Sequence, residues 1–163
     1  MGNKKTDKPN KLIKLCLAAS SGGHYEQLMM LKPLMDKYDS FVITEKTLYR
    51  AEANGKKTYY LKQVNRKESF FLFKMIVNAF MSFRIYLKEK PDVIICTGVL
   101  AMIPMCLLMK IFGKELIYIE SFAKVTSPTE TGKLLYKYAD QFYVQWESMK
   151  EFYPRAICLG GIY

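Results

Sequence analysis

Short apolar runs alternate with longer segments of helical periodicity along the whole chain of 163 residues. The short runs are rich in β-branched and aromatic residues and are bounded by polar or glycine-containing stretches, as strands are. They predict strands over residues 11–18, 40–44, 57–62, 92–96, 115–120, 141–145 and 156–159. The segments between them predict helices over about 24–37, 68–89, 99–112, 131–139 and 147–152. This alternation is typical of the α/β class, so we predict a single Rossmann-like, doubly wound parallel sheet. The domain would span residues 11–163, after a flexible basic arm over residues 1–10.

The segment "ESFFLFKMIVNAFMSFRIYLKEK", residues 68–90, predicts a helix that is apolar over most of its circumference. Lys74, Asn78 and Ser82 recur at a spacing of four, and nearly everything between them is large and apolar. One interpretation is a helix buried in the core, since hydrophobicity on all sides normally indicates burial. The other is a helix that lies in a membrane interface, which its basic flanks favour. For this second interpretation we expect the membrane contacts to be Phe70, Phe71, Phe73, Phe80, Phe83, Arg84 and Lys88.

No segment of the sequence predicts a transmembrane helix. The run "VLAMIPMCLLM" ends at Lys110 and contains Pro104, well short of the roughly 20 residues needed to cross a bilayer. It predicts a buried helix instead. The first residues, "MGNKKTDKPNK", are polar and basic, unlike a signal peptide. With membrane contact through this basic arm and the helix over residues 68–90, we expect a protein held peripherally on the cytoplasmic face of the cell membrane.

Charge is unevenly distributed along the chain. Residues 1–90 hold 18 Lys and Arg against 8 Asp and Glu, whereas residues 91–163 hold 7 of each kind. Nucleic acid, an anionic membrane surface or a phosphate-bearing substrate would each explain this bias, and so would a surface that keeps the protein soluble. Nucleic acid is disfavoured, because the aromatic clusters lack the basic-aromatic alternation of a single-strand binding surface.

Metal and cofactor sites are not expected. The four cysteines, Cys16, Cys96, Cys106 and Cys158, lie in apolar runs without the spacing of a metal site, so we predict reduced core residues. With a single histidine, structural zinc has almost no ligands available.

Three short motifs follow predicted strands and should meet at the carboxyl edge of the sheet. The first is "SSGGH", Ser20–His24, in which Gly22 and Gly23 permit a tight turn into a helix. The N–H groups of such a helix start are suited to a phosphate, and His24 beside them could bind it or accept a proton. A helix N-terminus favours the neutral imidazole. The alternative is that the two glycines only form a tight turn and that His24 has no role in binding or catalysis.

The other two motifs are Thr97-Gly98 and Glu120-Ser121. Thr97 could contact a ligand or cap a helix, and the residues do not distinguish the two. Glu120 ends the apolar strand "LIYIE", where an ionised carboxylate needs a partner or a ligand, which favours a functional role.

The chain resembles the acceptor-side subunit of the two-chain UDP-N-acetylglucosamine transferase of dolichol-linked oligosaccharide synthesis. It resembles the bacterial counterparts of that subunit in capsule and exopolysaccharide clusters still more closely. The resemblance runs from about Leu12 to the last residue. It is carried by "SSGGHYEQL", by "PDVIICTGVLAMIP" and by "YIESFAKVTSPTETGKLLYKYADQFYVQWESMKEFYP". The lipid-linked N-acetylglucosaminyltransferase of peptidoglycan synthesis is similar more distantly, through its Gly-Gly-His loop. Eukaryotic members usually begin with a transmembrane anchor, from which this sequence departs.

The resemblance implies that residues 11–163 are the acceptor-binding, N-terminal half of a split GT-B glycosyltransferase. A separate subunit would bind the nucleotide sugar, and the acceptor would be a polyprenyl-diphosphate-linked saccharide, with no cofactor. By resemblance, His24 and Glu120 are the candidate catalytic residues, His24 as a base or as a diphosphate contact. The diphosphate site would comprise Ser20, Ser21, Gly22, Gly23, Thr97, Gly98 and Ser121. The alternative function is a scaffold that only recruits and activates a catalytic partner at the membrane.

Overall fold

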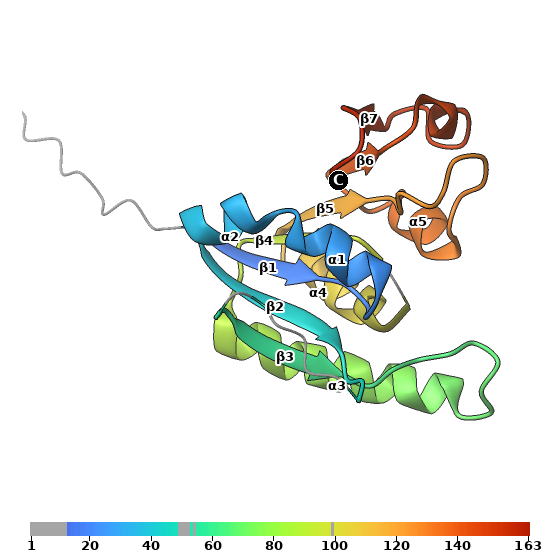
Figure 1. Cartoon of the computed structure of the whole chain (residues 1–163). Coiled ribbons are helices and arrows are strands. Elements are labelled where there is room, and N and C mark those ends of the chain that lie inside the picture. Colours follow the sequence, from blue (N-terminus) through green and yellow to red (C-terminus); the bar gives the residue numbers. More distant parts are fainter. Residues whose placement is uncertain (1–12, 49–52, 54, 99) are drawn as a thin grey trace, which may run out of the picture.

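The computed structural model describes residues 13–48, 53, 55–98 and 100–163, so the predicted arm over residues 1–10 lies outside the described residues. A seven-stranded parallel sheet forms the centre of the domain (Figure 1). Its strands lie in the order β3-β2-β1-β4-β5-β6-β7, and each neighbouring pair is parallel. In chain order they are β1 (Lys14–Ala18), β2 (Asp39–Glu45), β3 (Lys57–Leu61), β4 (Val93–Cys96), β5 (Glu115–Ile119), β6 (Gln141–Val144) and β7 (Ile157–Cys158). All seven predicted strands are confirmed, as is the α/β class.

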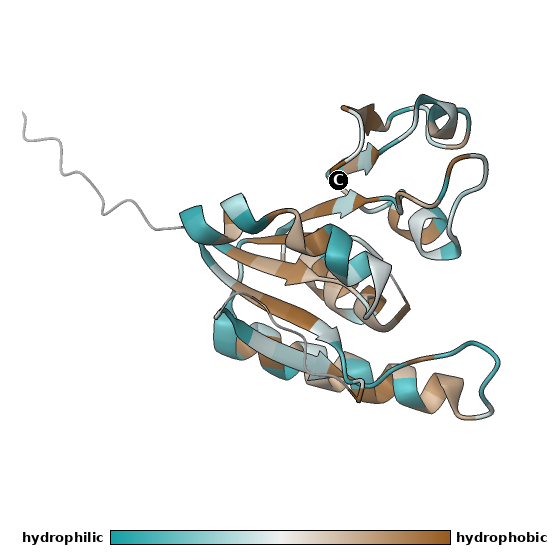
Figure 2. Cartoon of the chain, viewed as in Figure 1, coloured by the Kyte–Doolittle hydropathy of each residue, from teal (hydrophilic) through white to brown (hydrophobic). Residues whose placement is uncertain are grey.

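Helices cover both faces of the sheet, as a doubly wound fold requires. One face carries α1 (Gly23–Met29) and α2 (Lys32–Lys37), and the other carries α3 (Phe71–Glu89), α4 (Ile103–Ile111) and α5 (Glu130–Leu135). Strand β1 shows why two layers are needed. Its residues Leu15 and Leu17 pack with α1 and α2, while Cys16 and Ala18 belong to the larger core on the opposite side. Figure 2 shows that β1 and β2 are apolar along most of their length, whereas the edge strand β3 is more polar.

The helix boundaries differ from the predicted ones in four places. A single helix over 24–37 is wrong, because α1 ends at Met29 and α2 begins at Lys32. Pro33 lies in the first turn of α2, where its missing N–H costs nothing. Pro104 likewise starts α4, after a 3₁₀ turn over Leu100–Met102. Neither proline kinks a helix interior. Helix α5 ends at Leu135, short of the predicted 139, and the helix expected over 147–152 is a 3₁₀ turn, Glu147–Glu151.

The cysteines are free thiols in the structure. Cys16, Cys96 and Cys106 are buried in the larger core, as predicted, whereas Cys158 on the edge strand β7 is only half-buried. Burial raises the pKa of the Cys16 thiol well above its usual range, so this side chain stays protonated.

Candidate functional site

The ends of β1 and β4 lie side by side at the carboxyl edge of the sheet, where the direction of winding changes. The backbone N–H of Ser20 donates to the carbonyl oxygen of Gly98 over 3.1 Å. The Thr97 hydroxyl donates to the carbonyl oxygen of His24 over 2.9 Å. The first two predicted motifs are therefore in direct contact, at the position where ligands of open α/β sheets bind.

The third motif is tied to the first through Gln27, one turn along α1 from His24. The buried Gln27 amide donates from Nε2 to the Glu120 carbonyl oxygen over 3.3 Å. Its Oε1 accepts from the backbone N–H of Phe122, also over 3.3 Å. Both ends of the amide are engaged, so α1 and the segment after β5 hold each other in place.

Two glycines of these motifs have backbone conformations that other residues rarely adopt. Gly22 has φ +77° and precedes α1, and its carbonyl oxygen accepts from the N–H groups of Tyr25 and Glu26. Gly98 has φ +111°. A Cβ at Gly98 would lie 3.2 Å from Cε1 and 3.3 Å from Nδ1 of His24. Gly98 is therefore required both for its conformation and for the close approach of the imidazole.

His24 stands half-buried at the start of α1. Its Nδ1 atom is buried and has no hydrogen-bond partner among the described residues. Desolvation lowers the pKa of His24, although the nearby Thr97 backbone and the negative charge of Glu120 act in the opposite direction. Burial therefore favours the neutral imidazole, which can accept a proton; the cause is desolvation, whereas the sequence analysis had invoked the helix N-terminus.

A cavity of about 400 Å³ lies directly beside His24. It is lined by Gly23, His24, Gln27, Ser121, Phe122, Ala123 and Tyr163. Three of these were predicted as site residues: Gly23, His24 and Ser121. The other predicted residues of the loops, Ser20, Ser21, Gly22, Thr97 and Gly98, are not among the residues that line it.

Four lining residues were missed by sequence reasoning. Gln27 could have been found, because it lies one helical turn from His24 and shares its face. Phe122 and Ala123 directly follow the Glu120-Ser121 motif, so extending that motif would have included them. Tyr163 carries no local signal, since only the tertiary structure brings it next to Gly23.

Glu120 is held by neighbours within the chain. Its side chain is 1% exposed and accepts hydrogen bonds from the Ser121 N–H at 2.9 Å, the Thr129 hydroxyl at 2.9 Å and the Tyr153 hydroxyl at 2.8 Å. The Thr129 N–H adds a fourth, at 3.2 Å. The carboxylate is not among the groups that line the cavity. Its direct contacts are those of a positioning residue that fixes the Ser121 segment, so a direct catalytic role stays a prediction.

A second buried carboxylate near the site was missed. Glu45 ends β2 and is 5% exposed. Burial raises its pKa, while hydrogen bonds from the backbone N–H groups of Val64 and Ser21 act to lower that pKa. Glu45 thus fastens the "SSGGH" turn to the segment that follows β3. The sequence did contain a signal for Glu45, since it is a charged residue at the end of a buried strand.

Helix α3 buries polar as well as apolar side chains. Asn78 and Ser82, two of the three residues that the sequence spacing had singled out, lie on its buried face with Ile85 and Tyr86, whereas Lys74 is only half-buried. The Asn78 amide pairs with both backbone groups of Lys62, accepting from N–H over 2.9 Å and donating to the carbonyl over 2.8 Å. The exposed face carries the apolar stripe Phe70, Leu72, Phe73, Ile76, Phe80, Phe83 and Leu87, of which five are more than 60% exposed.

The predicted membrane-contact residues are largely on this stripe. Phe70, Phe73, Phe80 and Phe83 are exposed, as are Arg84 and Lys88. Phe71 is half-buried and packs against the larger core, so its membrane contact stays a prediction with less exposed surface behind it. The interpretation of α3 as a fully buried core helix is wrong, because this stripe is exposed.

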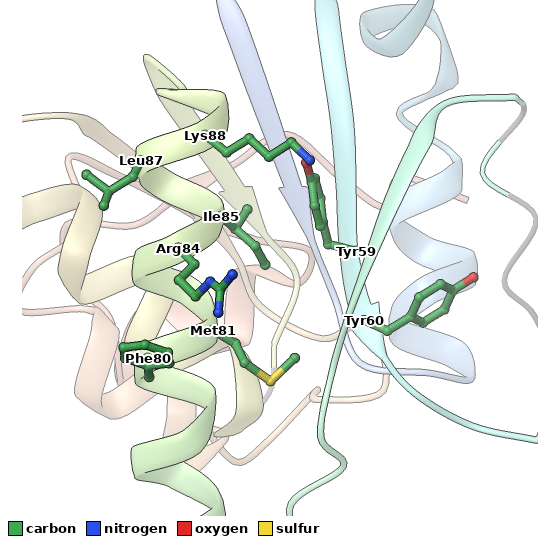
Figure 3. A pocket seen from close by; sticks show the side chains of 8 residues that line it. All are labelled: Tyr59, Tyr60, Phe80, Met81, Arg84, Ile85, Leu87 and Lys88. Atoms are coloured by element: carbon green, nitrogen blue, oxygen red, sulfur yellow. The ribbon is translucent and has the colours of Figure 1, made fainter.

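A groove of about 700 Å³ runs between α3 and β3 (Figure 3). Its lining is mainly apolar and comprises Tyr59, Tyr60, Phe80, Met81, Arg84, Ile85, Leu87 and Lys88. Arg84 and Lys88 reach from α3 toward β3, and Lys88 Nζ lies 5.9 Å from the centre of the Tyr59 ring. Neither cation forms an ion pair with another described residue. The groove therefore joins apolar surface to two positive charges, each of which lies over an aromatic ring.

Within the described residues, no helix has the length and apolar character needed to span a membrane. In the same part of the chain, no three His, Cys, Asp or Glu side chains gather as metal ligands would.

Comparison with known proteins identifies the family. The family model described as "Oligosaccharide biosynthesis protein Alg14 like" matches residues 15–162, which is nearly all of the chain. This chain belongs to the Alg14 family. Among curated members, the rat UDP-N-acetylglucosamine transferase subunit ALG14 is 30% identical over 183 residues, covering 94% of this chain and 85% of the rat protein. The human subunit of the same name is 28% identical with the same coverage. The bacterial capsule counterpart expected from the sequence is not among the relatives named here.

Solved structures agree on the fold of this Alg14 family chain. MurG from Acinetobacter baumannii matches with a TM-score of 0.67 and 16% identity, over 83% of this chain and 42% of MurG. UDP-N-acetylglucosamine 2-epimerase from Methanocaldococcus jannaschii matches with a TM-score of 0.68 and 11% identity, over 91% of this chain and 46% of the epimerase. The chain therefore spans less than half of these proteins. Its sheet has the Rossmann-like fold of the N-terminal half of GT-B glycosyltransferases, as predicted.

Proposed function

We propose that this chain is the acceptor-binding and membrane-recruiting subunit of a two-component glycosyltransferase. The enzyme would transfer a sugar from a UDP-sugar to a saccharide linked to polyprenyl diphosphate. The names of the relatives support a transferase subunit that uses UDP-N-acetylglucosamine, which makes this nucleotide sugar the first donor to test. The observation that carries the proposal is the neutral, half-buried His24 on the wall of the 400 Å³ cavity.

The residues of the cavity suit a general-base mechanism. The acceptor hydroxyl lies against the His24 imidazole, which takes its proton as the oxygen attacks the anomeric carbon of the donor sugar. The bond between that carbon and the UDP oxygen breaks, and UDP leaves with the bonding electron pair. Gly98 permits the close packing of the imidazole, and Glu120 fixes the Ser121 segment opposite it. The "SSGGH" turn and Ser121 contact the acceptor diphosphate.

The nucleotide sugar is bound by a separate partner subunit. The fold of the described residues corresponds to one half of a GT-B enzyme, in which the donor and acceptor are held by different halves. This supports a chain that is inactive without its partner. Capsular or exopolysaccharide synthesis is the setting that the sequence resemblance favours.

His24 is tested by substitution in the complex with the partner. We expect His24→Ala to lower the transfer rate by about 10²–10⁴-fold, the usual contribution of a general base. Glu26→Ala, on the exposed side of the same helix, is the matched control and should leave the rate unchanged. A His24→Ala complex with wild-type activity would refute the catalytic assignment. Appreciable transfer by the partner alone, merely enhanced by this chain, would favour the scaffold alternative.

The stripe on α3 is the proposed membrane contact, on the cytoplasmic face of the cell membrane. Its aromatic side chains can enter the interface while Arg84 and Lys88 attract anionic headgroups. We expect the chain to float with liposomes that contain anionic lipid, and to do so less in high salt.

A paired variant tests this surface. Replacing Phe73 and Phe80 by Ser should weaken liposome binding by at least about 10-fold, because each exposed ring contributes roughly 1 kcal/mol or more when it leaves water. Leu48→Ser, which removes an apolar side chain that is 99% exposed but not on α3, should have little effect. Liposome binding that survives the Phe73 and Phe80 substitutions would exclude α3 as the contact.

A further inference from the structure

Three aromatic rings gather at one end of the His24 cavity. The Phe122 ring lies 5.0 Å from that of Trp146 and 5.1 Å from that of Tyr163, measured between centroids. The Trp146 indole donates to the Phe122 carbonyl oxygen over 2.7 Å, which holds Phe122 from behind. Phe122 and Tyr163 both line the cavity.

Tyr163 is held in this position by contacts with distant parts of the chain. The backbone N–H of Ile162 donates to Gln145 Oε1 over 3.1 Å. A Cβ at Gly161 would lie 2.9 Å from the Phe122 ring, so the glycine allows the backbone to pack directly on that ring. The Tyr163 hydroxyl donates to the Gly23 carbonyl oxygen over 3.2 Å, which brings its ring beside the residue that precedes His24.

Tyr163 keeps surface that a ligand in the cavity can reach. The residue is 57% exposed although its hydroxyl is hydrogen-bonded. The face of an aromatic ring carries partial negative charge, and the face of a pyranose ring presents C–H groups with partial positive charge. A cavity with an aromatic wall and a few polar groups is the usual design of a site for a small organic ligand.

We infer that Tyr163, supported by Phe122, stacks on the pyranose ring of the acceptor sugar nearest the diphosphate. This inference rests on the proposed acceptor function and adds a residue that selects for a saccharide over a bare lipid diphosphate. In this arrangement the imidazole of His24 faces a hydroxyl at the edge of the ring, while Tyr163 covers one of its faces.

The test compares ligands that differ only in the sugar. Three ligands are titrated into the full chain: farnesyl diphosphate alone, and farnesyl diphosphate that carries either glucose or N-acetylglucosamine. Binding is followed by calorimetry and by the fluorescence of Trp146, the single tryptophan. For the wild type we expect at least one sugar-bearing ligand to bind about 5- to 10-fold more tightly than farnesyl diphosphate.

Two variants at one position separate stacking from the hydroxyl contact. Tyr163→Phe keeps the ring and should retain the preference for the sugar-bearing ligand. Tyr163→Ala should abolish the preference and leave the affinity for farnesyl diphosphate unchanged. Tyr138→Ala, at another half-exposed tyrosine outside the cavity lining, is the control and should behave as the wild type.

The outcomes distinguish this inference from the proposed function. If Tyr163→Ala weakens all the ligands equally, the residue supports the start of α1 and the stacking inference is overturned. The same holds if the wild type binds the sugar-bearing ligands and farnesyl diphosphate equally well, a result that leaves the acceptor function standing. If none of the lipid diphosphates binds and His24→Ala does not alter transfer, the proposed function itself fails.

Discussion

Replacing Gly132 in α5 by alanine provides a test, because helix propensity predicts a gain in stability and tertiary packing predicts a loss. In a helix interior, alanine is more favourable than glycine by about 1 kcal/mol. In this structure, however, a Cβ at residue 132 would overlap Glu120 Oε2 and would lie 2.6 Å from the Tyr153 hydroxyl and 2.8 Å from the Thr129 hydroxyl. These are the groups that surround the buried Glu120 carboxylate, so Gly132→Ala must displace at least one of them.

The expected cost follows from these contacts. Overpacking of a tight site costs about 1–3 kcal/mol. Loss of one hydrogen bond to a charged, buried carboxylate adds about 1.5–3 kcal/mol. After subtraction of the propensity gain, Gly132→Ala should lower the free energy of unfolding by about 3 kcal/mol. For a chain of this size, that corresponds to a melting temperature lower by about 6–12 °C.

Thermal and urea unfolding, followed by circular dichroism, measure the effect. Lys133→Ala is the control on the same helix, because its exposed ion pair with Glu130 contributes at most about 0.5 kcal/mol. Since Glu120 also holds the Ser121 N–H, the Gly132→Ala protein should in addition bind the proposed lipid-diphosphate acceptor more weakly. A Gly132→Ala protein that melts at or above the wild-type temperature would show that the packing argument is wrong.

Three further predictions concern buried polar groups. Burial would raise the pKa of Glu89, but hydrogen bonds from Lys14, Lys57 and Tyr59 outweigh it and lower the pKa from 4.5 to about 2. A carboxylate whose pKa is lowered by folding contributes stability above pH 4.5, and this contribution is lost as the pH falls toward 2. Glu89→Gln should therefore lower the free energy of unfolding by about 2 kcal/mol at pH 7 and have no effect near pH 2. An equal loss of stability at both pH values would contradict this. Asn78→Leu introduces a more apolar side chain but removes two hydrogen bonds to Lys62, so it should lower the free energy of unfolding in urea by about 2–3 kcal/mol. Ile76→Asn on the exposed face should lower it by less than about 0.5 kcal/mol. The transfer rate should be constant near pH 7 and should fall as the pH is lowered and His24 becomes protonated. Because burial lowers the pKa of His24, the midpoint of this fall should lie below pH 6.5, and a midpoint above pH 6.5 would contradict a neutral base.

The sheet was predictable because its signal is local. A strand buried on both faces must be apolar along its length, so the run that becomes β1 or β4 is visible without knowledge of its neighbours. Alternation with helical segments then leaves few possible topologies, and the observed order is the common one. Helix ends were less predictable. The break between α1 and α2 depends on Pro33 starting a second helix, a use of proline that the sequence does not distinguish from a kink.

The polarity of α3 shows the limit of sequence patterns most clearly. Periodicity singled out Asn78 and Ser82 as one face of a helix, and a polar face is normally the one in contact with water. The structure instead buries Asn78 and Ser82 beside Ile85 and Tyr86, and the Asn78 amide satisfies the two backbone groups of Lys62, directly after β3. Which face is buried depends on partners that lie on another element, and no local rule supplies them.

For the candidate site, the sequence by itself determined the motifs and their common edge of the sheet, because parallel strands end on the same side. Only the tertiary structure decided the contacts of each group. It closed the carboxylate of Glu120 inside hydrogen bonds from Ser121, Thr129 and Tyr153, and it brought Tyr163 to Gly23 across 140 residues. The physical reason is that hydrophobic periodicity is a property of neighbouring residues, whereas the satisfaction of a polar group depends on which distant segments folding brings within hydrogen-bond distance.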